Sequence, residues 1–71
     1  MTLTLEEMIT NAINNPDKKF RYNKWDINEY IYWDNNKHHF IDEADYIYII
    51  DDIVPHTGWI EFIEEHDYVS E

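Results

Sequence analysis

The sequence contains no cysteine and a single glycine, Gly58, among its 71 residues. Without cysteine the chain has no disulfide and no thiolate metal ligand. With one isolated glycine it has no glycine-rich loop of the kind that holds phosphates. The only serine, Ser70, stands near the end and outside any nucleophile motif. These absences predict a protein that is not an enzyme and that uses no cofactor.

Long apolar runs are also missing. No stretch approaches the roughly 20 residues that span a membrane, and the first residues lack the basic region of a signal peptide. We therefore expect no membrane association and a location in the cytoplasm of a host cell. A chain of 71 residues predicts one domain, 1–71. So small a domain buries only about 60% of its unfolded surface, which favours a homodimer or a higher oligomer.

Basic residues are scarce and end early. The last of the five is Lys37, and ten acidic residues but no Lys or Arg follow from His38 onward, which accounts for most of the net charge of −11. Such a surface disfavours direct contact with nucleic acid and favours a host protein with a basic groove, in the manner of a DNA mimic, or serves solubility alone. The predicted partner-binding carboxylates are Asp42, Glu43, Asp45, Asp51, Asp52, Glu61, Glu64 and Glu65.

The N-terminal part predicts an amphipathic helix over about 4–14. Apolar residues from Leu5 to Ile13 recur at the spacing of one helical face. Thr4 and Glu7 form the pattern of a capping box. Asn15 and Pro16 end the helix, because the residue before proline avoids the α region.

The rest, about 18–64, predicts strands. Alternation or apolar runs mark Lys18–Asn23, Glu29–Asp34, Lys37–Ile41, Tyr46–Ile50 and Trp59–Glu64. The run Tyr46–Ile50 is the longest, and we expect it to be the central strand. Trp59–Glu64 also fits a short helix, although Trp, Ile and Phe favour a strand. Residues 66–71 are expected to fray. The predicted fold is α+β, with one N-terminal helix packed on an antiparallel sheet of four to five strands.

The segment Lys18–Trp25 interleaves four cations with three aromatic residues. Such a combination holds phosphates and stacks bases in small nucleotide sites. The candidate nucleotide-binding residues are Lys19, Arg21, Lys24 and Trp25. The same alternation also fits a strand with one charged, solvated face and one face in the core, so both interpretations stay open.

A metal site is not expected. The adjacent histidines His38 and His39 point to opposite faces of a strand, and the acidic pairs Asp51-Asp52 and Glu64-Glu65 are neighbours in sequence. Neither arrangement converges on an ion, and no calcium-binding loop motif occurs.

In outline the chain resembles the small phage proteins of the Thoeris anti-defence 2-like family. Leu5–Asn14, Lys18–Trp25, Tyr30–Trp33 and Trp59–Phe62 correspond to its helix, its basic strand ending in Trp, its aromatic strand and its closing Trp segment. The chain has Gly58 where the family tends to place Asp before Trp, and it is shorter and more acidic. The resemblance implies a compact oligomer that sequesters a cyclic nucleotide immune signal at a subunit interface. Some relatives are linked to inhibition of CRISPR effectors.

Three functional hypotheses result. The first is a phage or mobile-element counter-defence inhibitor, such as an anti-CRISPR protein, that neutralises a host immune or nucleic-acid-handling protein through its acidic surface. The second is sequestration of a cyclic nucleotide by the Lys18–Trp25 patch in a homo-oligomer. The third is a small structural or regulatory subunit that docks through exposed aromatics such as Trp33 and Tyr48.

Overall fold

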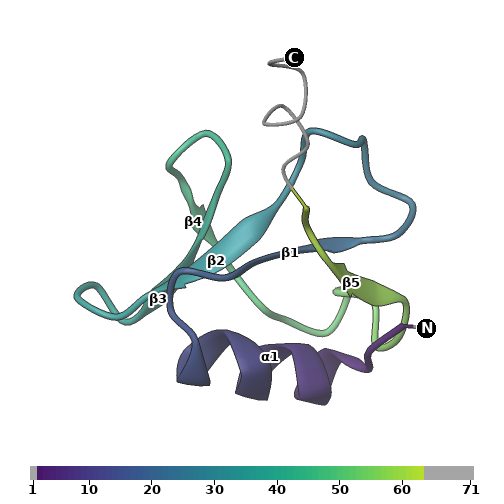
Figure 1. The fold of residues 1–71 in the computed structure, drawn as a ribbon, viewed down its shortest axis with the longest axis horizontal. Helices are drawn as coiled ribbons and strands as arrows, with labels where there is room; N and C mark the ends of the chain where they lie inside the picture. Colours follow the sequence, from purple (N-terminus) through teal and green to yellow (C-terminus); the bar gives the residue numbers. More distant parts are fainter. Residues whose placement is uncertain (1, 64–71) are drawn as a thin grey trace, which may run out of the picture.

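The computed structural model describes residues 2–63 as one N-terminal helix and a five-stranded antiparallel sheet (Figure 1). The elements are α1 Leu5–Asn14, β1 Lys19–Tyr22, β2 Ile31–Asp34, β3 His39–Asp42, β4 Ile47–Tyr48 and β5 Trp59–Glu61. The α+β prediction is confirmed. The segment that fitted both a strand and a helix contains the strand β5. The predicted frayed tail, 66–71, lies outside the described residues.

The start of α1 follows from its capping box. The Thr4 hydroxyl accepts a hydrogen bond from the Glu7 amide at 3.1 Å, and a Glu7 carboxylate oxygen accepts one from the Thr4 amide at 2.9 Å. These bonds satisfy two amides that lack partners inside the helix, and a cap of this kind stabilises by about 1 kcal/mol. At the other end, the Asn15 amide donates to the Asn11 and Ala12 carbonyls before Pro16 stops the helix.

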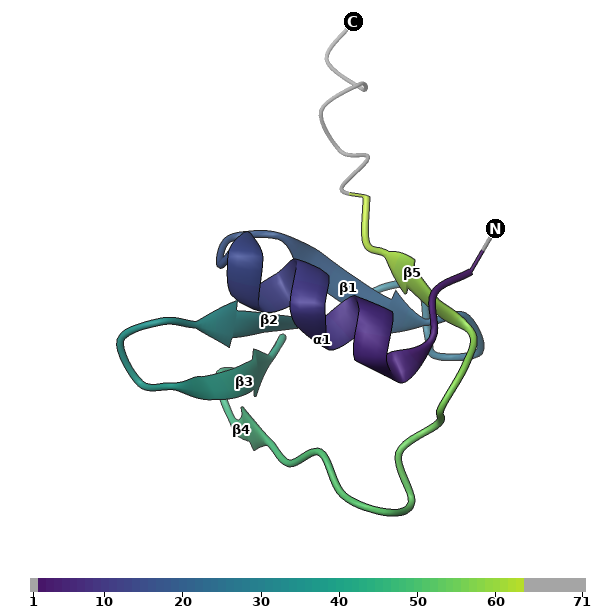
Figure 2. The ribbon, with the colours of Figure 1, turned by 90° about the horizontal axis from the view of Figure 1, so that it is seen from below.

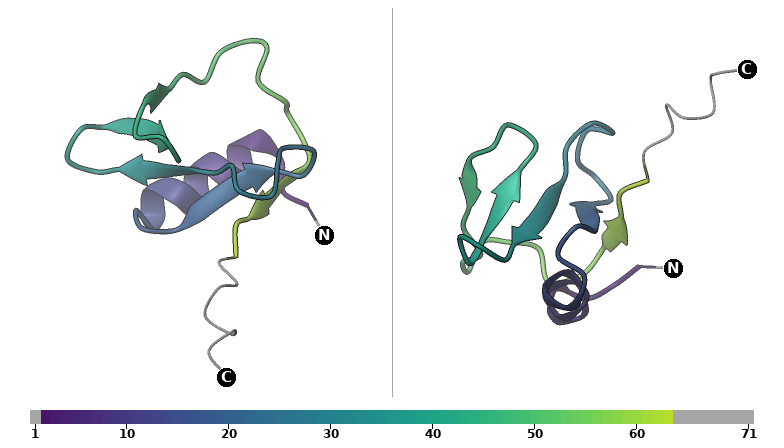
Figure 3. Two further views of the ribbon diagram at one scale, coloured as in Figure 1. Left: turned by 90° about the horizontal axis from the view of Figure 1, so that it is seen from above. Right: turned by 60° about the vertical axis from the view of Figure 1, so that its left-hand side comes forward.

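The strands lie in the order β4-β3-β2-β1-β5. β1 to β4 are neighbours in sequence as well as in the sheet, whereas β5 returns to pair with β1 on its other side. A view along α1 shows the strands as a curved layer on one side of the helix (Figure 3, right). The two edges of the sheet are therefore β4 and β5, the last two strands within residues 2–63.

The core lies between α1 and the face of the sheet that the helix covers (Figure 2). Strand register places Phe20 opposite Ile31 and Tyr22 opposite Trp59, so these side chains share that face. The buried apolar side chains of this core are Leu5, Met8, Ala12, Phe20, Ile31, Phe40, Val54 and Trp59. Lys19 and Arg21 alternate with Phe20 and Tyr22 and lie on the other face, as the period-two pattern predicts.

The prediction that Tyr46–Ile50 forms the central strand is wrong. The central strand is β2, whereas β4 covers only two residues of the run and lies at the edge, paired with β3 alone. The tight β3–β4 connection brings β4 beside β3, and the last strand then pairs with β1 instead of with β4. One hydrogen-bonding side of β4 thus stays unpaired, and the isoleucines Ile47 and Ile49 are exposed.

Trp25, in the β1–β2 loop, packs against the core on the face of the sheet that α1 covers. Its ring lies edge-on to Trp59 at 5.2 Å and to Tyr48 at 5.7 Å between centroids. Because Trp59 belongs to β5 and Tyr48 to β4, one aromatic side chain connects the two edge strands. Such edge-on pairs add about 0.5–1.5 kcal/mol each beyond the area they bury.

Gly58 allows this loop to meet the start of β5. Its φ is +89°, and its carbonyl accepts hydrogen bonds from the Asn23 amide at 2.9 Å and from the Asn23 side chain at 2.8 Å. A Cβ at this position would lie 2.5 Å from Asn23 Nδ2 and 2.9 Å from a Tyr22 ring carbon. Only glycine fits without a shift of these neighbours.

Candidate functional site

Four of the seven exposed large apolar side chains in the described residues lie in or near β4. Tyr46 is 71% exposed, Ile47 54%, Ile49 69% and Ile53 88%. An unpaired, apolar edge strand offers both backbone hydrogen bonds and side-chain contacts to another chain. We call residues 42–53, which contain β4 and the loops on its two sides, the β4 edge surface.

The turn that presents β4 is built around Asp42. One carboxylate oxygen, Oδ1, accepts hydrogen bonds at 2.9 Å from the amides of both Ala44 and Tyr46. The Asp42 amide in turn donates to the Tyr46 carbonyl at 2.9 Å. Asp45 takes a positive φ of 71°, which a short acidic side chain tolerates better than most. The acidic composition of this turn therefore has a structural role as well as an electrostatic one.

Five predicted partner-binding carboxylates belong to the β4 edge surface: Asp42, Glu43, Asp45, Asp51 and Asp52. The first three precede β4 and the last two follow it, so negative charge flanks Ile47 and Ile49 at both ends. The Asp51 carboxylate also accepts a hydrogen bond from the Ile53 amide at 3.2 Å and fixes the second loop. No lysine or arginine lies between His38 and Ile63, so residues 42–53 contribute no lysine or arginine to this surface.

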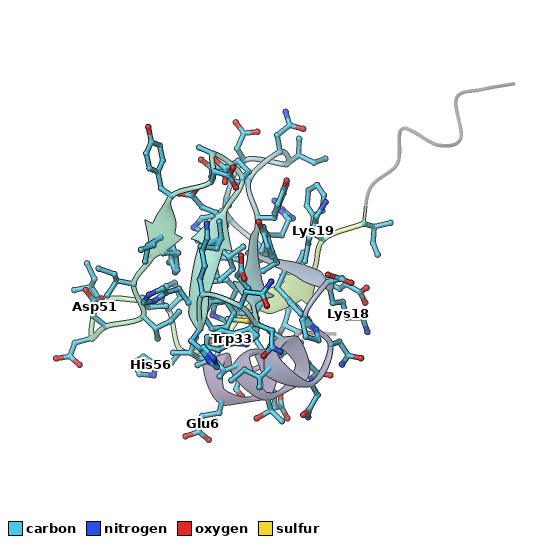
Figure 4. All side chains as sticks on the ribbon, turned by 90° about the vertical axis from the view of Figure 1, so that its left-hand side faces the viewer. Glu6, Lys18, Lys19, Trp33, Asp51 and His56 are labelled. Atoms are coloured by element: carbon cyan, nitrogen blue, oxygen red, sulfur yellow. The ribbon has the colours of Figure 1, made fainter. Side chains whose placement is uncertain are left out.

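Glu61 does not join this group. It lies on β5, the opposite edge of the sheet, where its carboxylate is 3.8 Å from the Lys18 ammonium. Figure 4 places Lys18 and Lys19 on the opposite side of the molecule from Asp51. Glu64 and Glu65 lie outside the described residues. The predicted acidic face is therefore divided, and the part that the structure brings together is the β4 edge surface.

The predicted nucleotide-binding residues are separated by the sheet. Lys19 and Arg21 share the face opposite the core, and Lys24 is exposed in the turn after β1. The Trp25 ring instead packs on the core face, against Tyr48 and Trp59. Arg21 is committed locally, since its Nη2 donates to the Trp25 carbonyl at 2.6 Å.

The surroundings of the basic strand are mixed in charge. A shallow hollow of about 350 Å³ beside Lys18 and Lys19 is also lined by Asp17 and Glu61. The Lys19 ammonium lies 4.7 Å from the centre of the Tyr30 ring, in a cation–π contact. Carboxylates at this hollow oppose a phosphate, so the geometry supports the nucleotide hypothesis less than the sequence pattern does.

The expectation that Trp33 and Tyr48 are exposed docking aromatics is wrong. Both are half-buried against the core, with the Trp33 ring 5.2 Å from Phe40 and the Tyr48 ring held by Trp25. The exposed side chains are their neighbours on and after β4. Sequence reasoning missed Ile47 and Ile49 as surface residues because an apolar run bounded by charge is also the signature of a buried strand.

Comparison with known proteins adds no assignment. No protein-family model, curated protein or solved structure gives a significant match to the chain. The resemblance drawn from the sequence pattern therefore remains a hypothesis.

Within residues 2–63 no group of histidine and acidic side chains is arranged to hold a metal ion. No helix in this part of the chain is long and apolar enough to cross a membrane.

Tyr48 makes the free energy of unfolding depend on pH in the alkaline range. Burial raises the pKa of its phenol above the ordinary value of 10.0, and the nearby Asp51 carboxylate raises this pKa further. The raised pKa stabilises the folded state fully below pH 10, and this contribution is lost as pH rises through the folded-state pKa. We expect the free energy of unfolding, measured in urea from pH 8 to 11, to fall less steeply at high pH in Tyr48→Phe. An unchanged pH profile in this variant would contradict the assignment.

Proposed function

We propose that the chain is a non-catalytic binding protein that docks its β4 edge surface onto a basic protein. The observation that carries this proposal is the juxtaposition of exposed Ile47, Ile49 and Ile53 with five carboxylates on one edge of the sheet. The apolar side chains supply affinity by leaving water. The carboxylates select a partner of opposite charge and speed its approach.

Other occupants fit this surface less well. A nucleic acid or an anionic membrane would meet five carboxylates and no cation. A second copy of the chain would bring the same negative edge against this one, with a net charge of −11 on each molecule. Like charges opposed across an interface are costly. A basic partner removes this cost and is attracted to the same groups.

The resemblance to phage anti-defence proteins supplies a biological setting. In that setting the partner is a host immune or nucleic-acid-handling protein with a basic groove, and the chain occupies the groove in place of nucleic acid. Carboxylates at both ends of β4 then stand where phosphates would bind. The chain thereby inhibits a defence system, such as a CRISPR effector, by binding without chemistry.

The first test is to identify what the chain holds. The protein is purified from a host lysate at low ionic strength and analysed by native mass spectrometry with small molecules retained. A one-to-one complex with a basic protein supports the proposal. A co-purifying nucleotide supports the Lys18–Trp25 hypothesis instead, and a homodimer free of other components contradicts the proposed docking. A stable complex with a neutral enzyme, insensitive to salt, supports the structural-subunit hypothesis.

The second test asks whether β4 makes the contact. Ile47→Thr keeps a β-branched side chain in the strand but removes apolar contact area, and we expect about tenfold weaker binding of the purified partner. The matched control is Ile63→Thr, because Ile63 is 59% exposed against 54% for Ile47 but follows β5 at the other edge. Isothermal titration calorimetry measures both. Equal affinities of the two variants would place the contact elsewhere.

A further inference from the structure

A pocket of about 270 Å³ opens where the β1–β2 loop meets the β3–β4 turn. Seven residues line it. Three are aromatic (Trp25, Tyr30 and Tyr48), three are acidic (Glu29, Asp42 and Glu43), and the seventh is Ile31. Three of these residues, Asp42, Glu43 and Tyr48, belong to the β4 edge surface. The Tyr48 side chain lies on the core face of β4, opposite the exposed Ile47. The pocket therefore adjoins the proposed docking surface through the β3–β4 turn.

Two of the aromatic walls are fixed by contacts outside the pocket, and the third, Tyr48, is fixed by one of these two. Trp25 packs edge-on against Trp59, and the Tyr30 ring lies 4.7 Å from that of Phe62. Tyr48 is held edge-on by Trp25 at 5.7 Å. Rings that are held in place lose little freedom when a ligand binds. Tyr30 also receives the Lys19 ammonium at 4.7 Å, which shows that its ring accepts a cation in this fold.

The acidic walls retain acceptors for a ligand. Within residues 2–63, Glu29 Oε1 accepts from the Asp26 amide at 3.1 Å, and Glu43 Oε1 from the Tyr30 amide at 3.4 Å. Asp42 uses Oδ1 for its two turn amides. In each case the second oxygen of the carboxylate is not engaged by these bonds. No lysine or arginine is among the residues that line the pocket.

Carboxylates and aromatic faces together recognise an organic cation. These carboxylates do not converge closely enough to hold a metal ion. A guanidinium group fits the arrangement better than an ammonium, because it is planar, stacks on aromatic rings and offers five hydrogen-bond donors to several carboxylates. The pocket is smaller than the roughly 300–1,000 Å³ of typical sites for whole small-molecule ligands, which favours a single side chain.

We propose that this pocket binds the guanidinium group of an arginine side chain that the basic partner presents beside β4. This inference rests on the proposed function, since it names the group by which the partner is recognised. It accounts for the presence of acidic residues in both the β1–β2 loop and the β3–β4 turn. Acidic residues that serve only the solubility of a turn would not require aromatic side chains beside them.

The test titrates the full chain with N-acetyl-arginine amide and follows backbone amides and tryptophan indoles by NMR. We expect saturable shifts at Trp25, Tyr30 and Glu43, and at least tenfold weaker binding in the double variant Glu29→Gln, Glu43→Gln. N-acetyl-citrulline amide has the same shape without the charge and should cause no saturable shift. The control variant Glu6→Gln, Asp17→Asn removes the same charge away from the pocket and should bind arginine as the unmodified chain does.

Two results would overturn the inference. One is the absence of saturable shifts with the arginine probe, and the other is equal binding of citrulline or of the Gln double variant. Failure here is distinguishable from failure of the proposed function. If Ile47→Thr weakens the partner complex while the Gln double variant does not, the β4 edge docks the partner without an arginine in the pocket. If neither variant weakens the complex, the docking surface itself is elsewhere.

Discussion

Trp59→Ala is expected to lower the free energy of unfolding by about 3–5 kcal/mol. The Trp59 side chain is fully buried, contacts Tyr22 and Trp25, and donates its indole N–H to the Pro55 carbonyl at 2.9 Å. The backbone of Trp59 also exchanges hydrogen bonds with Leu3, at 2.7 and 3.0 Å. Alanine would leave a cavity where helix, loop and β5 meet.

The expected loss of free energy is large relative to the total stability of the domain. A domain of this length has a total stability of roughly 4–10 kcal/mol, so the variant should be substantially unfolded at 37 °C. Urea denaturation followed by circular dichroism measures the change. Tyr46→Ala is the control, since it also removes an aromatic ring but from a side chain that is 71% exposed. A Trp59→Ala midpoint no lower than that of Tyr46→Ala would contradict the description of the core.

Local signals in the sequence were sufficient for much of this fold. The capping box at Thr4 and the stop at Pro16 predicted α1 to within a residue, because caps and proline act through neighbouring backbone groups. Alternation in Lys18–Asn23 predicted both the strand β1 and its two faces. These features depend on residues a few positions apart, so the chain carries them explicitly.

Pairing between distant segments could not be predicted in the same way. No local pattern near Tyr46–Ile50 or Trp59 predicts that β5 pairs with β1 and leaves β4 at the edge. The inward position of Trp25 depends on this arrangement, because its ring contacts Tyr48 of β4 and Trp59 of β5. The nucleotide hypothesis placed Trp25 beside Lys19 on sequence proximity alone, and the sheet puts the two on different sides.

The candidate site was predictable in its charge and not in its shape. The excess of carboxylates after Lys37 is visible in composition, and it predicted a basic partner. Which carboxylates lie together depends on the edge position of β4, which separates Glu61 from the Asp42–Asp52 segment. The aromatic and acidic pocket combines Glu29 with Glu43, two residues that no local pattern connects.

Reducing negative charge at the β4 edge should weaken the partner complex about tenfold or more at low ionic strength. The double variant Asp45→Asn, Asp52→Lys changes net charge by three, from −11 to −8. Asparagine tolerates the positive φ of residue 45, and Asp52 is exposed, so the fold should persist. Because the proposed docking places these charges against the partner, the dependence of affinity on salt should also become shallower.

A matched variant separates local contact from the overall field of the molecule. Asp17→Lys, Glu61→Gln makes the same change in net charge beside Lys18, which lies on the opposite side of the molecule from Asp51 (Figure 4). At about 8 Å of screening length in physiological salt, these distant charges should alter affinity less than threefold. Calorimetric titrations of both variants at 50 and 300 mM salt give the comparison. Equal weakening by the two would mean that net charge alone attracts the partner, and the carboxylates around β4 would then have no special part in recognition.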